Sequence, residues 1–111
     1  MAQVTGIVID KRKLEALQAG LRAKADAAVR KVALDVEAYA KSVVPVDTGN
    51  LKNSLSADKR GDFEWWVHTN VEYAPFVELG TSRIHAKPFL TPAVERARPV
   101  LIEAFKVIFE Q

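Results

Sequence analysis

The chain has 111 residues, a formal net charge of +2 and no cysteine. This length predicts one domain over residues 1–111, while the lack of cysteine excludes disulfides, thiol nucleophiles and cysteine-based zinc sites. No apolar run approaches the ~18 residues of a membrane span, and the N-terminus lacks the basic region and long apolar run of a signal peptide, so we expect a protein made and used in a cytoplasm.

The N-terminal part predicts an extended segment followed by one long helix. Residues 3–9 are rich in β-branched side chains and favour a short strand or arm leading to Asp10, a good helix N-cap. From there to Val44, apolar residues recur every three or four positions, the period of an amphipathic helix. Gly20 is its weakest point. Pro45 ends the helix, because proline lacks an N–H and disfavours the helical conformation in the residue before it.

The middle of the chain predicts a short helical turn and a β-hairpin. Asp47 or Thr48 caps a turn of helix that ends where the first strand begins. Residues 54–57 and 63–69 have the composition of two strands, joined by a loop over 58–62 with its glycine late in the turn.

Alternation along the second strand assigns its two faces. The more apolar face carries Phe63, Trp65, Val67 and Thr69. The more polar face carries Glu64, Trp66, His68 and Asn70. A tryptophan on the polar face needs cover, either from a helix of its own chain or from a neighbour, so Trp66 and His68 are interface candidates.

The C-terminal part predicts a short helix, a loop and a final helix. Residues 73–79 fit a short helix stopped by a glycine, and residues 81–87 form a polar, basic loop that we expect to be mobile in the free subunit. Thr91 is a good N-cap with Pro92 at the first helical position, and Pro99 is expected to kink or divide the last helix. The predicted fold class is α+β: a small antiparallel β-sheet packed against a long N-terminal amphipathic helix and a C-terminal helix.

One tripeptide has an enzymatic interpretation. Asp47-Thr48-Gly49 matches the segment that carries the catalytic carboxylate of aspartic proteases, where two such loops in a dimer share a proton and activate water. That fold is almost entirely β, whereas long helical periodicity stands on both sides of this triplet. A capping role explains Asp47 better, so the dimeric protease is a remote alternative and we predict no enzyme.

Other candidate sites for chemistry are weaker still. The chain has no nucleophile elbow, P-loop, zinc-protease or dinucleotide motif. Glu72 and Glu78, together with Asp47, do not have the spacing of a calcium loop, and caps and surface charges explain them better. We therefore predict no metal and no cofactor. The basic loop offers three further interface candidates: Arg83, His85 and Lys87.

Three short blocks of turn and apolar residues follow one another along the chain. The first comprises Pro45, Asp47, Thr48, Gly49, Leu51 and Ser54. The second comprises Tyr73, Ala74, Val77, Glu78, Gly80 and Thr81. The third comprises Pro88, Phe89, Leu90, Pro92 and Ala93. In this order and spacing they resemble the tail-completion or head-tail joining (neck) proteins of long-tailed bacteriophages, a family that includes minor tail proteins of lambda-like siphophages.

The resemblance implies a structural virion protein of the head-tail joint, a tail-completion factor or a tail terminator, assembled in the bacterial cytoplasm. Its implied partners are copies of itself in a ring of six, the connector or stopper, and the tube or terminator proteins, with genome DNA nearby in the lumen and no membrane. A ring closes only when each subunit presents two different complementary patches. The mildly acidic residues 45–80 and the mildly basic segments on either side are candidates for such patches.

A small nucleic-acid-binding regulatory module is the main alternative. It requires a concentrated basic face. The only basic run, Lys11-Arg12-Lys13, stands at the start of the predicted helix, where cations are slightly unfavourable. Arg83 and Lys87 alone are too few to grip DNA.

Overall fold

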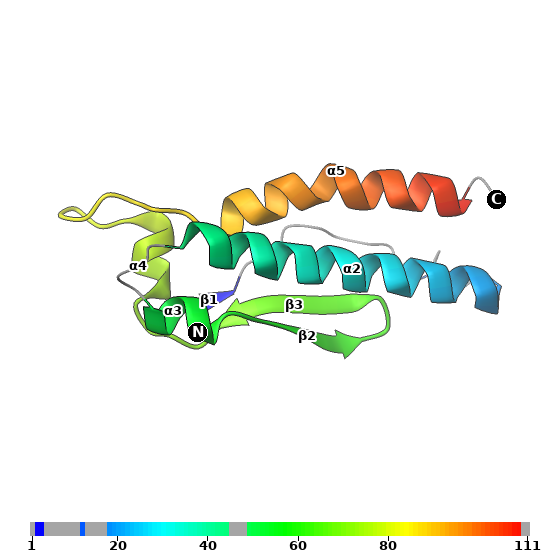
Figure 1. Cartoon of the computed structure of the whole chain (residues 1–111), viewed down its shortest axis with the longest axis horizontal. Coiled ribbons are helices and arrows are strands. Elements are labelled where there is room, and N and C mark those ends of the chain that lie inside the picture. Colours follow the sequence, from blue (N-terminus) through cyan, green and yellow to red (C-terminus); the bar gives the residue numbers. More distant parts are fainter. Residues whose placement is uncertain (1, 4–11, 13–17, 45–48, 110–111) are drawn as a thin grey trace.

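The computed structural model describes residues 2–3, 12, 18–44 and 49–109 of the chain. The molecule is elongated, with extents of 51 × 22 × 20 Å. The long helix α2 (Ala19–Val43) lies between the C-terminal helix α5 (Leu90–Phe109) and a small β-sheet (Figure 1). The predicted α+β class, with an antiparallel sheet and two long helices, is confirmed.

The sheet has three antiparallel strands in the order β1-β3-β2. The central strand β3 (Glu64–Thr69) pairs with β2 (Ser56–Gly61) on one side and with the two-residue strand β1 (Ala2–Gln3) on the other. Two short helices complete the described part of the chain: α3 (Gly49–Ser54) precedes the hairpin and α4 (Ala74–Leu79) follows it.

The long helix starts later than the periodicity predicts. Gln18 has an extended backbone, with φ −59° and ψ 154°, so an unbroken helix from Asp10 is wrong, although Asp10 itself lies outside the described residues. Side-chain periodicity reports which face is apolar and is insensitive to one residue that leaves the helical conformation. The predicted end is confirmed: Val44 is extended, with ψ 141°, directly before Pro45.

The hairpin is longer and its turn tighter than predicted. Residues 58–61, expected in the loop, continue β2, and only residues 62 and 63 form the turn. Gly61 therefore pairs with Glu64 inside the ladder, after an irregularity between Lys59 and Gly61. A bulge of this kind accommodates glycine, which the sequence pattern assigned to the turn itself.

Contacts with the long helices explain the tight turn. Phe63 has a φ of 58°, a left-handed conformation that costs free energy for a bulky residue, but its side chain is buried with Ala25 of α2 and Ile108 of α5. Asp26 of α2 accepts the Phe63 N–H at 3.4 Å, and its second oxygen lies 3.3 Å from Lys59 Nζ. The tertiary contacts of the hairpin tip thus offset the strained backbone.

The main core lies between α2, α5 and the inner face of the sheet. Leu51 of the first sequence block and Phe89 of the third are both fully buried in it. Thr69 at the end of β3 is also fully buried, and its hydroxyl forms a hydrogen bond with the Ser54 hydroxyl. Residues of the first and third blocks thus anchor their segments in the core.

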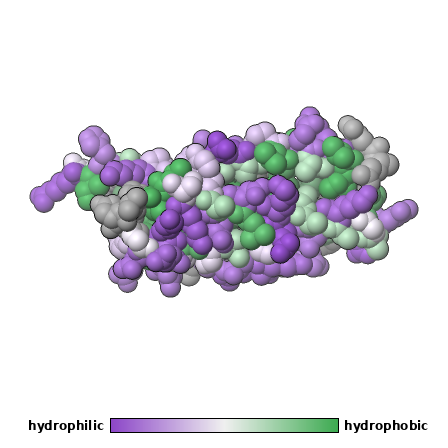
Figure 2. Space-filling view, in the orientation of Figure 1, coloured by the Kyte–Doolittle hydropathy of each residue, from purple (hydrophilic) through white to green (hydrophobic). Residues whose placement is uncertain are grey.

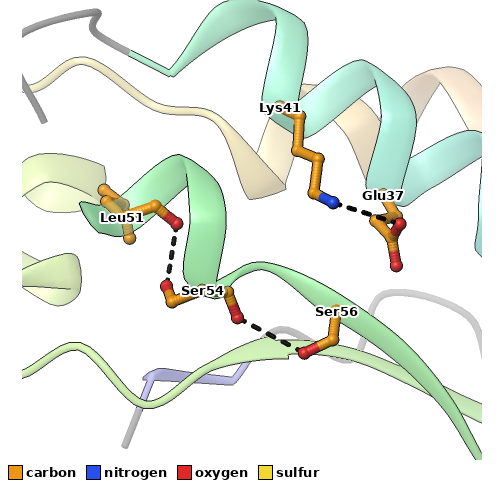
Figure 3. A network of polar contacts seen from close by, with 5 residues as sticks. All are labelled: Glu37, Lys41, Leu51, Ser54 and Ser56. Atoms are coloured by element: carbon orange, nitrogen blue, oxygen red, sulfur yellow. Dashed lines mark hydrogen bonds and ion pairs between the residues drawn. The ribbon is translucent and has the colours of Figure 1, made fainter. Parts of the chain in front are cut away.

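Polar contacts join α3 to the sheet (Figure 3). Ser54 Oγ donates to the Leu51 carbonyl at 2.8 Å, and Ser56 Oγ donates to the Ser54 carbonyl at 3.3 Å. On the adjacent turn of α2, Lys41 pairs with Glu37 at 3.4 Å. Serine hydroxyls that donate hydrogen bonds to nearby backbone carbonyls favour the sharp turn between α3 and β2.

The last helix is continuous through its internal proline. Pro99 is exposed and does not divide α5, which is one helix from Leu90 to Phe109. Phe109 is half exposed and contacts Phe105 edge-on at 6.1 Å between ring centroids. None of the helices that the structure describes combines the length and apolar character of a membrane span.

Candidate docking surface at the loop end

Glu78 of α4 caps the start of α5. Its Oε1 accepts the N–H groups of Phe89 and Leu90 at 3.1 and 2.9 Å, and its Oε2 accepts the Thr91 N–H at 3.1 Å. These are N–H groups that a helix N-terminus leaves without intrahelical partners. The predicted N-cap Thr91 is therefore wrong: α5 already begins at Leu90, and a carboxylate from another helix takes the capping role.

The same contacts perturb the ionisation of this carboxyl group. Burial raises the pKa of Glu78, but the hydrogen bonds from Leu90, Thr91 and Phe89 lower it by more, so that the net pKa is below its ordinary value of 4.5. Hydrogen bonds to a carboxylate favour the charged form, as does the positive end of the helix dipole. Glu78 thus holds α4 to α5 most strongly when ionised.

Gly80 turns the chain away from α4 into the loop. Its φ of 76° and ψ of 176° lie in a region essentially restricted to glycine. A Cβ at this position would stand 2.7 Å from the Ala86 backbone N and 2.9 Å from the Ile84 carbonyl O. Glycine is required here for two reasons: its backbone angles, and the close approach of the loop backbone at Ile84 and Ala86.

The loop between Gly80 and Phe89 is tied together by its own hydrogen bonds. The Thr81 N–H donates to the Ile84 carbonyl at 2.9 Å, and Thr81 Oγ1 accepts the N–H groups of Arg83 and Ile84 at 3.2 and 3.0 Å. At the base, the Lys87 N–H donates to the Val77 carbonyl at 2.8 Å. The predicted loop is present and protrudes from one end of the molecule (Figure 1); its mobility in the free subunit remains a prediction.

An apolar surface lies beside this loop. Leu79 is 77% exposed, the highest value among the large apolar residues that the structure describes, and Phe76 and Ile84 are both more than half exposed. A hollow of about 330 Å³ is lined by Tyr73, Phe76, Val77, Thr81 and Ile84. Figure 2 shows the corresponding hydrophobic area near the base of the loop. We call Phe76, Leu79 and Ile84, with the hollow, the end surface.

Three polar or basic side chains of the loop lie beside the end surface. Arg83, His85 and Lys87 are exposed, and none of the three has a side-chain partner among the described residues. The structure thus brings these three predicted interface candidates to one place. They adjoin Tyr73, Glu78, Gly80 and Thr81 of the second sequence block, and exposed Pro88 leads from them into the core.

The other two interface candidates lie elsewhere, on the outer face of the sheet. Trp66 is half-buried under Arg60, whose Cζ lies 5.0 Å from the ring centroid, and Trp66 Nε1 donates to Glu64 at 3.2 Å. His68 Nε2 contacts Asp58 and lies 3.4 Å from Arg60. The cover for Trp66 comes from the adjacent strand, a source that the sequence interpretation did not consider. An interface role for Trp66 and His68 remains a prediction.

The remaining residues of the three sequence blocks either belong to helices of the fold or lie outside the described residues. Pro45, Asp47 and Thr48 are outside it, and Gly49 begins α3. Pro92 stands in the first turn of α5, where a missing N–H leaves no hydrogen bond unmade. The exposed apolar residues of the end surface were missed from the sequence; an isoleucine inside a polar loop and a leucine next to the stopping glycine were the available signals.

Among the residues described, no group of three or more His, Asp or Glu side chains is placed to hold a metal ion. The features that do converge are exposed apolar side chains, unpaired cations and a hydrogen-bonded loop. Surfaces of this kind on a small α+β protein are typical of protein–protein binding.

A comparison with known protein families agrees with a protein that works by binding other proteins. Residues 11–80 match the model of the HK97-gp10-like family, described as "Bacteriophage HK97-gp10, putative tail-component". The match spans more than half of the chain, which therefore belongs to this family of phage tail components, and the phage-tail resemblance of the sequence blocks is confirmed. Searches of curated proteins and of solved structures found no significant match.

Proposed function

We propose that this tail component acts at the phage head-tail joint, as a tail-completion or tail-terminator subunit in a ring of six. Its partners there are further copies of itself, the capsid connector or stopper, and the tail tube or terminator proteins. The observation that carries the proposal is the protruding loop with two unpaired cations, Arg83 and Lys87, beside an apolar surface. Such a surface serves binding, and the family places it in a tail.

The charge of the loop supports a docking role in particular. Unpaired cations at the rim of an apolar patch raise the rate and selectivity of association with an acidic partner more than they raise affinity. They are also screened by salt over about 10 Å at 0.1 M ionic strength. We therefore expect joining that is sensitive to salt and to the sign of the loop charges.

Reversing two loop charges is expected to block joining. In a phage that lacks the gene, Arg83→Glu with Lys87→Glu should leave unjoined heads and tails in electron micrographs and reduce infectivity strongly, because like charges then face the acidic partner. Both side chains are exposed, so the subunit still folds.

The matched control is the double variant Arg30→Glu with Lys52→Glu. It makes the same change in net charge at exposed positions on α2 and α3. Normal virions are expected from it. Full infectivity from the loop variant, or equal loss from both variants, would remove the loop from the joint.

Substitutions of Asp47 test whether the protein is a binding protein or a protease. Because asparagine also caps helices well, Asp47→Asn is expected to retain joining, whereas Asp47→Ala should lower the free energy of unfolding by about 0.5–2 kcal/mol. The comparison uses the same complementation assay and urea unfolding. A peptidase activity of the purified protein that Asp47→Asn abolishes would support the protease alternative and contradict the proposal.

A further inference from the structure

A second apolar surface lies on the side of the molecule, between the two long helices. A groove of about 430 Å³ is lined by aliphatic residues of α2 and α5, with Asp35, Tyr39 and Arg96 as its polar members. The aliphatic residues are Val32, Val36, Ala93, Ala97 and Val100. We call this the α2–α5 groove. Figure 2 shows hydrophobic areas over α5, the outer layer of the fold.

Two exposed carboxylates lie in or beside the α2–α5 groove: Asp35 lines it, and Glu103 follows Val100 by one turn of α5. The one basic residue of the lining, Arg96, is stacked over Tyr39 with Cζ 4.4 Å from the ring centroid. The carboxylate of Asp35 is held by the exposed Lys31 at 3.0 Å, and that of Glu103, one turn beyond Val100, by Lys106 at 3.9 Å. Exposed pairs of this kind contribute little stability, so both carboxylates are free to exchange partners.

The end surface has the complementary properties. Leu79 projects from it as an exposed apolar side chain, and Arg83 and Lys87 beside it lack acidic partners in the described part of the chain. The glycine turn at Gly80 and the capping of α5 by Glu78 set the position of Leu79 relative to the start of α5. An apolar side chain that enters a groove, with opposite charges at the two rims, is an arrangement found in specific interfaces.

We propose that the end surface of one copy of this chain binds in the α2–α5 groove of a second copy. Leu79 enters the groove beside Val100, while Arg83 and Lys87 pair with Asp35 and Glu103. The two surfaces differ, so the contact is head-to-tail and repeats around a closed ring. The inference rests on the proposed function, in which the protein is a ring subunit, and it identifies the neighbouring copy as the partner of the loop.

The absence of cysteine allows a direct test by disulfide trapping. A single-cysteine Leu79→Cys protein is mixed with a single-cysteine Val100→Cys protein and oxidised, and the mixed pair is expected to form an interchain disulfide. Disulfides require Cα atoms about 4.4–6.8 Å apart. The control partner is Ile102→Cys, because Ile102 is 49% exposed against 51% for Val100 but lies on the opposite flank of α5. Equal trapping with both partners would contradict the proposal.

Sedimentation of two charge-bearing variants tests the head-to-tail geometry independently of disulfide geometry. Leu79→Asp and Val100→Asp should each weaken self-association about tenfold or more, which corresponds to about 1.4 kcal/mol. An equimolar mixture retains one intact end surface and one intact groove, and should form a 1:1 dimer and nothing larger. Both positions are exposed, and circular dichroism melts verify that the variants fold.

The outcomes separate this inference from the proposed function. A wild-type protein that stays monomeric and gives no trapped pair overturns the self-contact, even if loop variants still block head-tail joining through another virion protein. A trapped pair and a mixed dimer support the self-contact, even if complementation shows that joining does not need it. Association that either variant leaves unchanged also contradicts the contact.

Discussion

Gly80→Ala is expected to lower the free energy of unfolding by about 2–4 kcal/mol. Alanine rarely adopts the backbone angles found at Gly80, which costs about 1–3 kcal/mol for a residue with a side chain. The added Cβ would also stand 2.7 Å from the backbone N of Ala86. Relief requires the loop to move, which breaks the hydrogen bonds that link Thr81 to Ile84 and Lys87 to Val77.

Gly20→Ala is the matched control for this prediction, measured by urea unfolding alongside the first variant. Gly20 lies in the first turn of α2, and a Cβ there has nothing within 4 Å. Alanine is better than glycine in a helix by up to about 1 kcal/mol, so this variant should be neutral or more stable. A Gly80→Ala protein as stable as the wild type would show that the loop does not need its observed backbone conformation.

Glu78→Ala is expected to lower the free energy of unfolding by about 2 kcal/mol. The variant removes the acceptor of three backbone N–H groups at the start of α5 and the link from α4 to that helix. Loss of an ordinary side-chain cap costs about 0.5–2 kcal/mol, and bonds to charged acceptors are at the upper end of the range. Glu78→Gln keeps one neutral acceptor oxygen and should lose less.

The pH dependence of stability distinguishes the capping carboxylate from a surface charge. The pKa of Glu78 is lower in the folded protein than its ordinary value of 4.5. Its stabilisation is therefore complete above that value and is lost as the pH falls through the lower, folded-state pKa. The difference in unfolding free energy between wild type and Glu78→Gln should shrink over this acidic window. Glu72→Gln, at an exposed carboxyl just before α4, is the control for removal of one negative charge.

Local signals along the chain were sufficient for several features of the fold. The run of apolar residues at helical spacing and the Val44-Pro45 pair determined where the long helix lies and ends, because both act through the backbone of adjacent residues. Gly80 likewise marked the end of α4. Strand alternation assigned Val67 to the core and Trp66 to the outer face, since successive side chains of a strand point to opposite sides.

Contacts between residues far apart in the sequence were decided only by the tertiary structure. The turn at Phe63 is tight because α2 and α5 bury its ring, and no residue of the hairpin itself indicates that burial. The cap of α5 comes from Glu78, which is separated from the helix start by a whole loop, and so the local signal at Thr91 was misleading. Arg60 covers Trp66 because the strand register places the two side chains together.

The sequence likewise determined one part of the proposed docking surfaces, and the tertiary structure decided the rest. The sequence determined that a basic loop follows Gly80, because its charges and turn residues are adjacent in the chain. It did not determine that Leu79 and Ile84 would form one exposed surface, or that α2 and α5 would leave a groove beside Val100. Exposure of an apolar side chain depends on what packs against it after the helices have docked, and that is a property of the assembled fold.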